Sequence, residues 1–565
     1  MPGTPAWETY PAWPNLAAMM FDLARRWPDR PMLREHRNGA WRTTTWRIFA
    51  TQAAQLARNL RAAGISAGDR VLIVSANRPE YPIAETALMA IRAVPVPTYI
   101  TNTQADHAHV LADSGARAAI VSTPALAAIV ARAGPLDLLI TLEPFPDSPV
   151  RTLLWSDLLT GPTDPADIAA EAADIAPGAL ACLIYTSGTG GAPRGVMLPH
   201  RAILSNCRGA FELARPLALN HETYLSFLPL SHSYEHTAGQ FFMLSLGTEI
   251  AYARGIEHIA ADMLTIRPTM LTMVPRVLET IRTRILGAVA RQPPWKQRLF
   301  AQALAIGLRR LAHRLTLADR LLDPILERLV RREVRARFGG RLRAVICGGA
   351  RLEPAIGSFF LAFGIPLLQG YGQTEAGPVI AANPPLAIRI DSVGPPLQGV
   401  DLRIADDGEI LVRGDLVMDG YWGRPAETAA AIQDGWLHTG DIGTLDADRY
   451  LRITDRKRDM IVLSGGDNIS PARIEGLLIA DPAIAQAVIA GEGRSGLTAL
   501  LVPAEAADDA AVAAAVKSLN ARLALPERIR RHVIVPPFTL DNGLLTATQK
   551  IRRHLVLKTY AGLLD

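Results

Sequence analysis

Apolar residues recur along the chain with two periods, and these periods predict helices and strands in turn. Residues 46–63 and 81–91 carry them at helical spacing, whereas residues 70–74 and 94–99 form short apolar runs typical of buried strands. Two further runs predict strands over 179–184 and 342–346. Helical and extended patterns that alternate in this way favour a layered α/β architecture.

The chain is too long for one hydrophobic core. Its 565 residues predict at least two domains. The character of the sequence changes near Asp455, and helical patterns follow over 471–480 and 507–525. We therefore expect a large α/β domain of several subdomains over residues 1–455 and a small α+β domain over residues 456–565.

Composition and charge limit the functional class. Hydrophobic residues make up 49% of the chain, which argues against disorder. A net charge of +5 would suit nucleic acid, but acidic residues are nearly as numerous as basic ones and no nucleic-acid motif occurs, so we expect no nucleic-acid partner. An anionic substrate or a membrane surface explains the charge equally well.

The sequence shows neither a secretory signal nor a membrane-spanning run. The N-terminus lacks a basic region followed by an apolar stretch, and no apolar run reaches about 18 residues. The three cysteines, Cys182, Cys207 and Cys347, are interpreted as reduced packing residues. We expect a cytoplasmic protein and leave open peripheral contact with the inner membrane face.

A glycine-rich stretch follows the apolar run over 179–184. Residues 185–195 read Tyr-Thr-Ser-Gly-Thr-Gly-Gly-Ala-Pro-Arg-Gly. Glycines let consecutive backbone N–H groups point at one anion, and Ser, Thr and Arg add donors, so the stretch predicts a polyphosphate site. A flexible linker is the alternative. A P-loop is excluded because Val196 and Met197 stand where Lys and Ser/Thr are required, and a dinucleotide loop because Pro193 stands where Gly is needed.

This stretch resembles the signature of the adenylate-forming superfamily, which contains acyl-CoA synthetases, luciferases and the adenylation domains of peptide synthetases. The usual form is T-S-G-[S/T]-T-G-x-P-K-G. Gly190 stands where a second Thr is usual, and Arg194 replaces Lys, which keeps the positive charge in a planar form. The resemblance implies ATP contacts from Thr186, Ser187, Gly188, Thr189, Gly190 and Arg194.

A second segment, residues 371–375, reads Tyr-Gly-Gln-Thr-Glu and resembles the family's Y-G-x-T-E. The resemblance implies that Tyr371, with Gly372 beside it, covers the adenine, that Thr374 reaches the α-phosphate and that Glu375 holds Mg²⁺. One carboxylate beside phosphate oxygens suits that ion. Taken alone, the segment could equally be a turn with a capping Thr.

Two more segments complete the nucleotide set implied by the resemblance. Residues 435–441 resemble G-W-x-x-T-G-D, whose last residue, here Asp441, accepts hydrogen bonds from both ribose hydroxyls. Residues 347–350 resemble, more weakly, the segment that borders adenine and the acyl group. The nominated residues there are Gly348, Gly349 and Ala350.

Residues 455–469 resemble the family's interdomain hinge and the loop after it. In this resemblance Arg456 touches the ribose or a phosphate, Arg458 is the pivot, and Gly465 and Gly466 line the path of a thiol. The alternative for the charged part is a solvated charge run. Residues 542–553 resemble the N-G-L-L-T-x-T-x-K-x-R-R of long-chain members and nominate Lys550 as a catalytic lysine on a mobile small domain.

The acyl substrate is indicated by residues 228–235, which resemble the L-P-L-x-H-x-Y-E of long-chain acyl-CoA synthetases. The resemblance implies that His232 and Tyr234 help to wall the acyl pocket, with Gly348 and Gly349 near them. A structural role is the alternative for His232. Ser233 stands where an amino-acid-activating domain would place an Asp, which argues against an amino-acid substrate.

Residues 281–343 look like an insertion typical of the same long-chain branch. Arginines and leucines alternate through residues 308–337. This pattern favours helices packed on the core with a solvated basic face, and contact with an anionic membrane surface is the alternative.

The resemblance as a whole implies an ATP-dependent fatty-acyl-CoA ligase that acts on long-chain acids and uses Mg²⁺ and CoA. The implied catalytic residues are Thr189, Glu375, Arg456 and Lys550. Three alternatives stay open: an acyl-AMP ligase that serves a carrier protein, a CoA ligase for aryl or other acids, and a non-catalytic nucleotide-binding protein. A homodimer is also left open.

Overall fold

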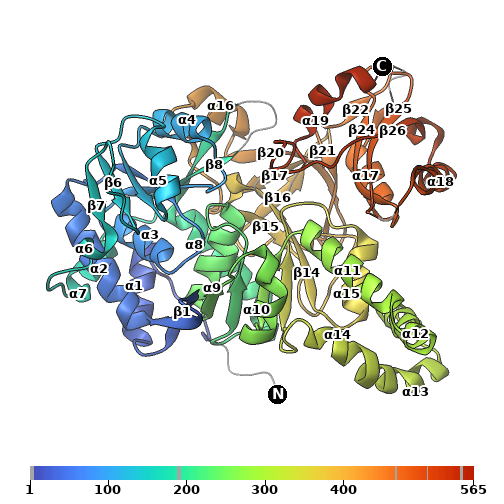
Figure 1. Ribbon diagram of the computed structural model, residues 1–565, viewed down its shortest axis with the longest axis horizontal. Coiled ribbons are helices and arrows are strands. Elements are labelled where there is room, and N and C mark those ends of the chain that lie inside the picture. Colours follow the sequence, from blue (N-terminus) through green and yellow to red (C-terminus); the bar gives the residue numbers. More distant parts are fainter. Residues whose placement is uncertain are drawn as a thin grey trace.

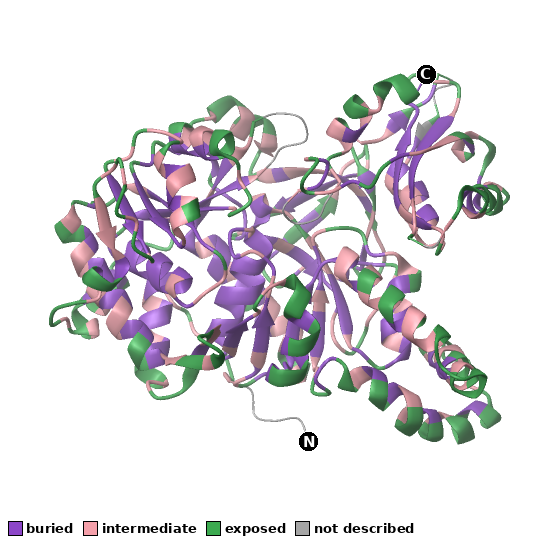
Figure 2. Cartoon of the chain, viewed as in Figure 1, coloured by how far each residue is buried: buried purple, intermediate pink, exposed green. Residues whose placement is uncertain are grey.

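The computed structural model describes residues 6–186, 192–457, 459–464, 467–505, 507–546 and 551–564. Figure 1 shows a large α/β body, a smaller C-terminal unit beside it, and a helical hairpin that projects from the body. The predicted α/β class is confirmed. Figure 2 shows that the sheets of the body are largely buried between helices.

The N-terminal sheet is parallel throughout, with the strand order β4-β3-β5-β6-β7. Its strands are β3 (Arg70–Val74), β4 (Val94–Thr98), β5 (Ala118–Val121), β6 (Leu138–Thr141) and β7 (Thr152–Leu154). The helices of this region are α1 (Leu16–Arg26), α2 (Trp46–Ala63), α3 (Glu80–Ala90), α4 (Gln104–Ser114), α5 (Pro124–Ala131), α6 (Trp155–Leu158) and α7 (Pro165–Ala173).

The predicted elements of this region are confirmed to within a residue. The helix over 46–63 is α2, because the Thr45 side chain caps its first turn by accepting from the Ile48 N–H and Gly64, at a φ of 106°, ends it. The strand over 70–74 is β3. The helix over 81–91 begins and ends one residue earlier, as α3, and the strand over 94–99 ends one residue earlier, as β4.

A second sheet forms the centre of the body, with the strand order β15-β14-β13-β12-β10-β11-β1-β2. Only its two edge pairs, β14 with β15 and β1 with β2, are antiparallel among the described strands. The strands are β1 (Pro31–Arg37), β2 (Ala40–Thr45), β10 (Thr223–Ser226), β11 (Glu249–Tyr252), β12 (Met270–Met273), β13 (Ala344–Cys347), β14 (Leu367–Gly372) and β15 (Val379–Ala382). The strand predicted over 342–346 is β13, which begins two residues later.

Helices and a short π-helix cover the central sheet. The helices are α8 (His200–Ala214), α9 (Phe242–Ser245), α10 (Ile259–Ile266) and α15 (Pro354–Ala362), and the π-helix is η2 (Glu235–Phe241). Parallel strands covered on both faces consist mostly of uncharged residues. The strand β12 is an example, because all four of its residues are uncharged and buried.

Two smaller sheets complete the body. One contains β8 (Leu180–Thr186), β9 (Arg194–Pro199) and β18 (Gly420–Tyr421). The other contains β16 (Asp401–Ile404), β17 (Glu409–Arg413), β19 (Ile432–Gln433), β20 (Trp436–Leu445) and β21 (Leu451–Arg456). The helix α16 (Pro425–Ala431) lies between β18 and β19 in the sequence. The strand predicted over 179–184 is β8, and it continues to Thr186.

The C-terminal unit has its own hydrophobic core. Its strands are β22 (Ile461–Val462), β23 (Asn468–Ile469), β24 (Ile484–Ala490), β25 (Leu497–Pro503) and β26 (Ile529–Ile534), and its helices are α17 (Pro471–Ile479), α18 (Asp509–Asn520) and α19 (Arg553–Thr559). The helix predicted over 471–480 is α17. The helix predicted over 507–525 was too long, because Asp508 caps α18 by accepting from the Ala511 N–H and the chain leaves the helix after Asn520.

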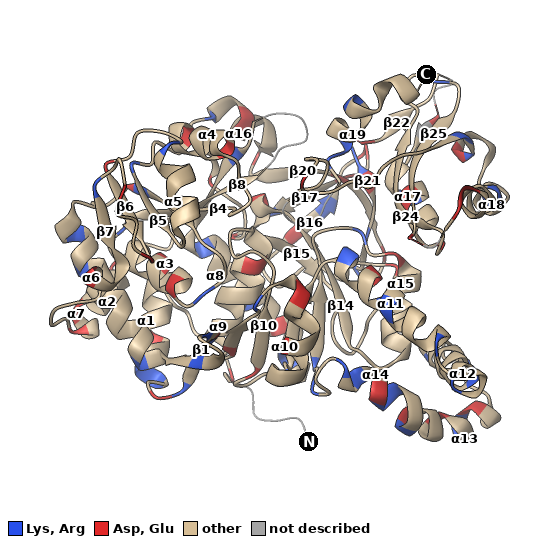
Figure 3. Ribbon diagram, in the orientation of Figure 1, with Lys and Arg blue, Asp and Glu red and all other residues tan. Residues whose placement is uncertain are grey.

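The predicted insertion forms a helical hairpin. Its elements are α11 (Pro275–Ala290), α12 (Pro294–Leu311), α13 (Leu317–Leu326), the π-helix η4 (Glu327–Arg331) and α14 (Arg332–Ala336). Figure 3 shows that Lys and Arg residues are frequent along it. Among the described residues, no helix combines the length and the apolar character that crossing a membrane requires.

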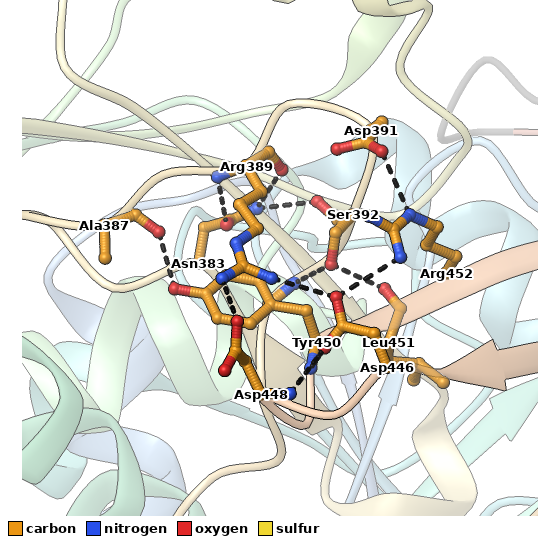
Figure 4. A network of polar contacts seen from close by, with 11 residues as sticks. Asn383, Ala387, Arg389, Asp391, Ser392, Asp446, Asp448, Tyr450, Leu451 and Arg452 are labelled. Atoms are coloured by element: carbon orange, nitrogen blue, oxygen red, sulfur yellow. Dashed lines mark hydrogen bonds and ion pairs between the residues drawn. The ribbon is translucent and has the colours of Figure 1, made fainter.

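A polar network joins the loop after β15 to the turn between β20 and β21 (Figure 4). The Arg389 guanidinium lies 3.9 Å from the centre of the Tyr450 ring and binds Asp446 at 2.9 Å. The Ser392 hydroxyl donates to the Leu451 carbonyl at 2.7 Å. These contacts fix β20 and β21 relative to the end of the central sheet, where β14 and β15 pair.

Candidate active site

The end of β14 carries four of the predicted nucleotide-binding residues. Gly372 is required there, because a Cβ at this position would lie 1.8 Å from the Pro378 carbonyl oxygen. A short 3₁₀ turn, η5 (Thr374–Ala376), follows at once, so Tyr371, Thr374 and Glu375 lie close together at the carboxyl end of a strand. Open α/β sheets bind ligands at such edges.

Three predicted residues from distant parts of the sequence meet at this edge. The Tyr371 hydroxyl donates to Asp441 Oδ2 at 2.6 Å, and Arg456 Nε lies 3.3 Å from Asp441 Oδ1. Burial and then the neighbouring Asp441 carboxylate raise the pKa of Tyr371, so its hydroxyl stays protonated and remains a donor. Asp441 itself is almost fully buried, on β20.

Glu375 is half-buried beside this group. Its Oε1 accepts a hydrogen bond from the Tyr421 hydroxyl at 2.9 Å, and its backbone carbonyl accepts from the Met418 N–H at 3.0 Å. Among the described residues, no group of three or more His, Cys, Asp or Glu side chains is placed to hold a metal. A single fixed carboxylate fits an Mg²⁺ ion whose other ligands are phosphate oxygens and water.

Arg194, the residue that departs from the usual Lys, lies next to Glu375. Its guanidinium stacks on the Tyr421 ring at 4.1 Å, and its Nη1 binds Glu427 Oε2 at 3.0 Å. Glu427 also binds Arg424 at 3.1 Å. A lysine has no planar group for this stacking, so the arrangement gives the substitution a structural reason.

The other predicted residues of the glycine-rich stretch are placed only in part. Thr186 is the last residue of β8, and its buried hydroxyl has no hydrogen-bond partner among the described residues. The predicted residues that lie outside the described ranges are Ser187, Gly188, Thr189, Gly190, Arg458, Gly465, Gly466 and Lys550.

Three of the predicted acyl-binding residues, His232, Tyr234 and Gly349, line a cavity. Leu228, Pro229, His232, Tyr234, Glu235, Val274 and Gly349 surround it. The Tyr234 hydroxyl donates to the Ile346 carbonyl at 3.0 Å, and its N–H donates to His232 Nδ1 at 3.1 Å. His232 thus has a structural contact as well as a place in the cavity wall.

Of the two predicted glycines, Gly349 lines this cavity, and Gly348 lies against the ring of Tyr234. A Cβ on Gly348 would lie 3.3 Å from the Tyr234 ring, and Gly349 has a φ of +85°. Ala350, the next predicted residue, is exposed and does not line the cavity. The Ser233 and Thr374 hydroxyls lie 2.8 Å apart, which joins the cavity segment to the Tyr371–Glu375 edge.

Sequence reasoning missed Glu235 as a site residue. Its fully buried carboxylate accepts hydrogen bonds from Tyr224 at 2.8 Å, Ser226 at 2.6 Å and Thr272 at 2.7 Å. Burial raises the pKa of Glu235 to about 7, although these hydroxyl donors oppose the shift. The available signal was its place as the last residue of the 228–235 segment, an ionisable carboxylate directly after the predicted pocket residue Tyr234.

The comparisons with known proteins decide the family. The AMP-binding enzyme family matches residues 20–422, and the AMP-binding enzyme C-terminal domain matches residues 458–565. The chain belongs to the AMP-binding enzyme family. This confirms the adenylate-forming family that the glycine-rich stretch and the later motifs predict.

Two relatives of this AMP-binding enzyme cover nearly its whole length. The long-chain-fatty-acid–CoA ligase FadD15 of Mycobacterium tuberculosis is 34% identical over 581 residues, which are 97% of this chain and 96% of that one. The peroxisomal long chain acyl-CoA synthetase 6 of Arabidopsis thaliana is 29% identical over 581 residues, 93% of this chain and 81% of that one.

Solved structures show the same fold for this AMP-binding enzyme. The anthranilate CoA ligase AuaEII in complex with anthranoyl-AMP has a TM-score of 0.76 at 20% identity and covers 98% of each chain. The Bacillus subtilis o-succinylbenzoate CoA synthetase in complex with ATP and magnesium has a TM-score of 0.70 at 22% identity, covering 95% of this chain and 98% of that one. These likenesses confirm the predicted adenylate-forming fold.

Proposed function

We propose that this enzyme activates a long-chain fatty acid with ATP and transfers the acyl group to CoA. The observation that carries the proposal is the meeting of Tyr371, Asp441 and Arg456 beside the Glu375 carboxylate, next to an apolar cavity. The relatives named long-chain-fatty-acid–CoA ligases support the choice of substrate and acceptor.

The nucleotide has a place at the β14 edge. In this proposal the Tyr371 ring covers the adenine, the Asp441 carboxylate accepts from the ribose hydroxyls, and Thr374 donates to the α-phosphate. Mg²⁺ on Glu375 would offset the charge of the phosphates when it is bound. Arg194 and Arg456 supply further positive charge toward the nucleotide.

The first half-reaction joins the acid to the nucleotide. The fatty carboxylate, held at the mouth of the cavity near His232 and Gly349, attacks the α-phosphorus, and the bond to the pyrophosphate oxygen breaks. Alignment of the two reactants and neutralisation of their negative charges lower the barrier. Lys550, in the small domain, would bridge the carboxylate and the α-phosphate while this charge builds up.

The second half-reaction makes the thioester. The CoA sulfur attacks the acyl carbonyl, its proton leaves to solvent or a base, and AMP departs with the electrons of the broken C–O bond. We infer that residues 1–455 and 456–565 act as two domains that change their relative orientation between the steps, with Arg458 as the pivot. Gly465 and Gly466 would then border the thiol's path, where the absence of side chains permits close approach.

Among the described residues beyond Lys457, hydrogen bonds to residues 1–455 are few, which suits such a change. Arg276 Nη1 donates to the Ala485 carbonyl at 3.0 Å, and the Ser470 hydroxyl donates to the Thr454 carbonyl at 3.3 Å. Because fatty acids of this length partition into bilayers, the proposal includes peripheral contact with a membrane. A homodimer stays a prediction.

Acids of about twelve to eighteen carbons should drive Mg²⁺-dependent formation of acyl-CoA and AMP, and short acids should be poor substrates. Each methylene that enters the apolar cavity contributes about 0.8 kcal/mol, roughly a fourfold gain in affinity. The measurement is kcat/KM over a panel from acetate to stearate, with benzoate added. Faster turnover of acetate or benzoate than of palmitate would contradict the assigned substrate.

Arg194→Ala should raise the KM for ATP about 10- to 100-fold, because a hydrogen bond to a charged group contributes about 1.5 to 3 kcal/mol. Arg194→Lys should be tolerated, since the charge remains. Glu427→Gln removes the ion pair but leaves Arg194 free for phosphate, so the KM for ATP should not rise. The matched control is Arg201→Ala, which breaks another arginine–carboxylate pair, Arg201–Asp419 at 2.6 Å. An unchanged KM in Arg194→Ala would limit Arg194 to its contacts with Glu427 and Tyr421.

A further inference from the structure

The outer face of α13 presents apolar side chains to solvent. Leu317 and Leu321 are 80% and 78% exposed, and Leu322 and Ile325 of α13 and Leu329 of η4, which continues it, are also exposed. On a helix these positions fall within one arc of the surface. Leu308 and Leu311 are exposed at the end of α12, a few residues before α13 begins.

The hairpin does not need this face for its own packing. Its inner side holds Leu326, which belongs to the core cluster that also contains Phe300 and Ile306. The fully buried Arg331 donates to the Ala303 carbonyl at 3.0 Å and lies 2.7 Å from Asp323. Contiguous exposed apolar patches mark interaction sites, whereas single exposed leucines are ordinary.

The part of the hairpin from α12 to α14 has a larger net positive charge than the whole chain. Residues 294–337 contain eleven Lys and Arg and four Asp and Glu, a net charge of +7, whereas the whole chain has +5 and the remainder is therefore slightly acidic. The exposed arginines for which no ion pair is formed among the described residues are Arg298, Arg314, Arg320, Arg328, Arg332 and Arg337. Figure 3 shows Lys and Arg positions distributed along these helices.

We propose that the outer face of α13, with Leu308 and Leu311, docks on the surface of an anionic lipid bilayer. An apolar helix face flanked by arginines inserts its leucines between the headgroups, while the arginines bind phosphate groups. A second copy of the chain fits less well, because two such faces would bring like charges together. This proposal rests on the membrane contact included in the proposed function and names its surface; it is tested without substrate, so it can fail while the ligase activity stands.

The test is co-sedimentation of the whole protein with vesicles of phosphatidylcholine alone and with about 30 mol% phosphatidylglycerol, at low and high salt. The protein should bind the anionic vesicles, and salt should weaken the binding. Leu317→Glu combined with Leu321→Glu should lower the partition coefficient at least about tenfold, since charged groups are costly among lipid chains. Arg320→Gln combined with Arg328→Gln should reduce the preference for anionic lipid.

Leu386→Glu is the matched control, because Leu386 is 81% exposed but belongs to the loop after β15 and not to the hairpin. Its binding should equal that of the unchanged protein, and AMP formation from soluble acid should be normal in all variants. No binding to anionic vesicles, or an equal loss in Leu386→Glu, would overturn the proposal. A second result would also overturn it: light scattering shows a dimer, the leucine variants are monomers, and vesicle binding persists. That result would assign the face to a second copy of the chain.

Discussion

Lys550→Ala should slow formation of the acyl-adenylate by about two to three orders of magnitude, the scale for removing one preorganised electrostatic donor. The charge of Lys550 is useful only while the carboxylate and the α-phosphate approach each other, so its loss appears in the rate of that step. The variant should still convert synthetic acyl-AMP and CoA into thioester at nearly the normal rate. The measurement is single-turnover kinetics of each half-reaction.

Lys558→Ala is the control for this variant, because Lys558 is an exposed lysine on α19 of the same small unit. It should leave both half-reactions unchanged. Arg458→Pro should give the opposite pattern to Lys550→Ala, since proline fixes a backbone dihedral at the proposed pivot and thioester formation needs the domain to move. Equal loss of both half-reactions in both folded variants would refute the alternation of domains.

Asp441→Ala should lower kcat/KM for ATP by at least about hundredfold. The buried carboxylate would accept two ribose hydroxyls, and each hydrogen bond to a charged group contributes about 1.5 to 3 kcal/mol. Tyr371→Phe removes only the donor that fixes Asp441 at 2.6 Å and should cost less than about tenfold. The KM for the fatty acid should change little, because the cavity is unaltered.

Asp401→Ala provides the comparison, because Asp401 pairs with Arg413 at 2.9 Å on the exposed surface of the same sheet. An exposed pair of this kind contributes little, so the variant should match the unchanged enzyme in activity and thermal stability. If Asp441→Ala were folded and as active toward ATP as Asp401→Ala, the nucleotide would bind elsewhere.

Local pattern was enough to predict much of the fold. The helix α2 was predicted to the residue because it has both a capping Thr45 and a terminal Gly64, whereas α18 was predicted too long because apolar alanines and leucines continue past Asn520 without a helix. Periodicity reports which residues suit a helix, and tertiary contacts such as those of Asn520 with Ile529 decide where it ends.

The candidate site was predicted residue by residue from motifs, but not its geometry. Tyr371, Asp441 and Arg456 are far apart in the sequence, and only the folded sheets bring them within hydrogen-bond distance. The pairing of Arg194 with Glu427 has no local signal at all. The leucines of the insertion have helical spacing, and this pattern favoured helices packed on the core. In the structure Leu326 is buried in the core, whereas Leu317 and Leu321 are exposed.

The most direct test of the central claim is detection of the product thioester by mass spectrometry. The enzyme is incubated with palmitate, ATP, Mg²⁺ and CoA, and each component is omitted in turn. Palmitoyl-CoA and AMP should form in equal amounts only in the complete mixture. Accumulation of palmitoyl-AMP that CoA does not consume, or the absence of any ATP turnover, would contradict the assignment of a fatty-acyl-CoA ligase.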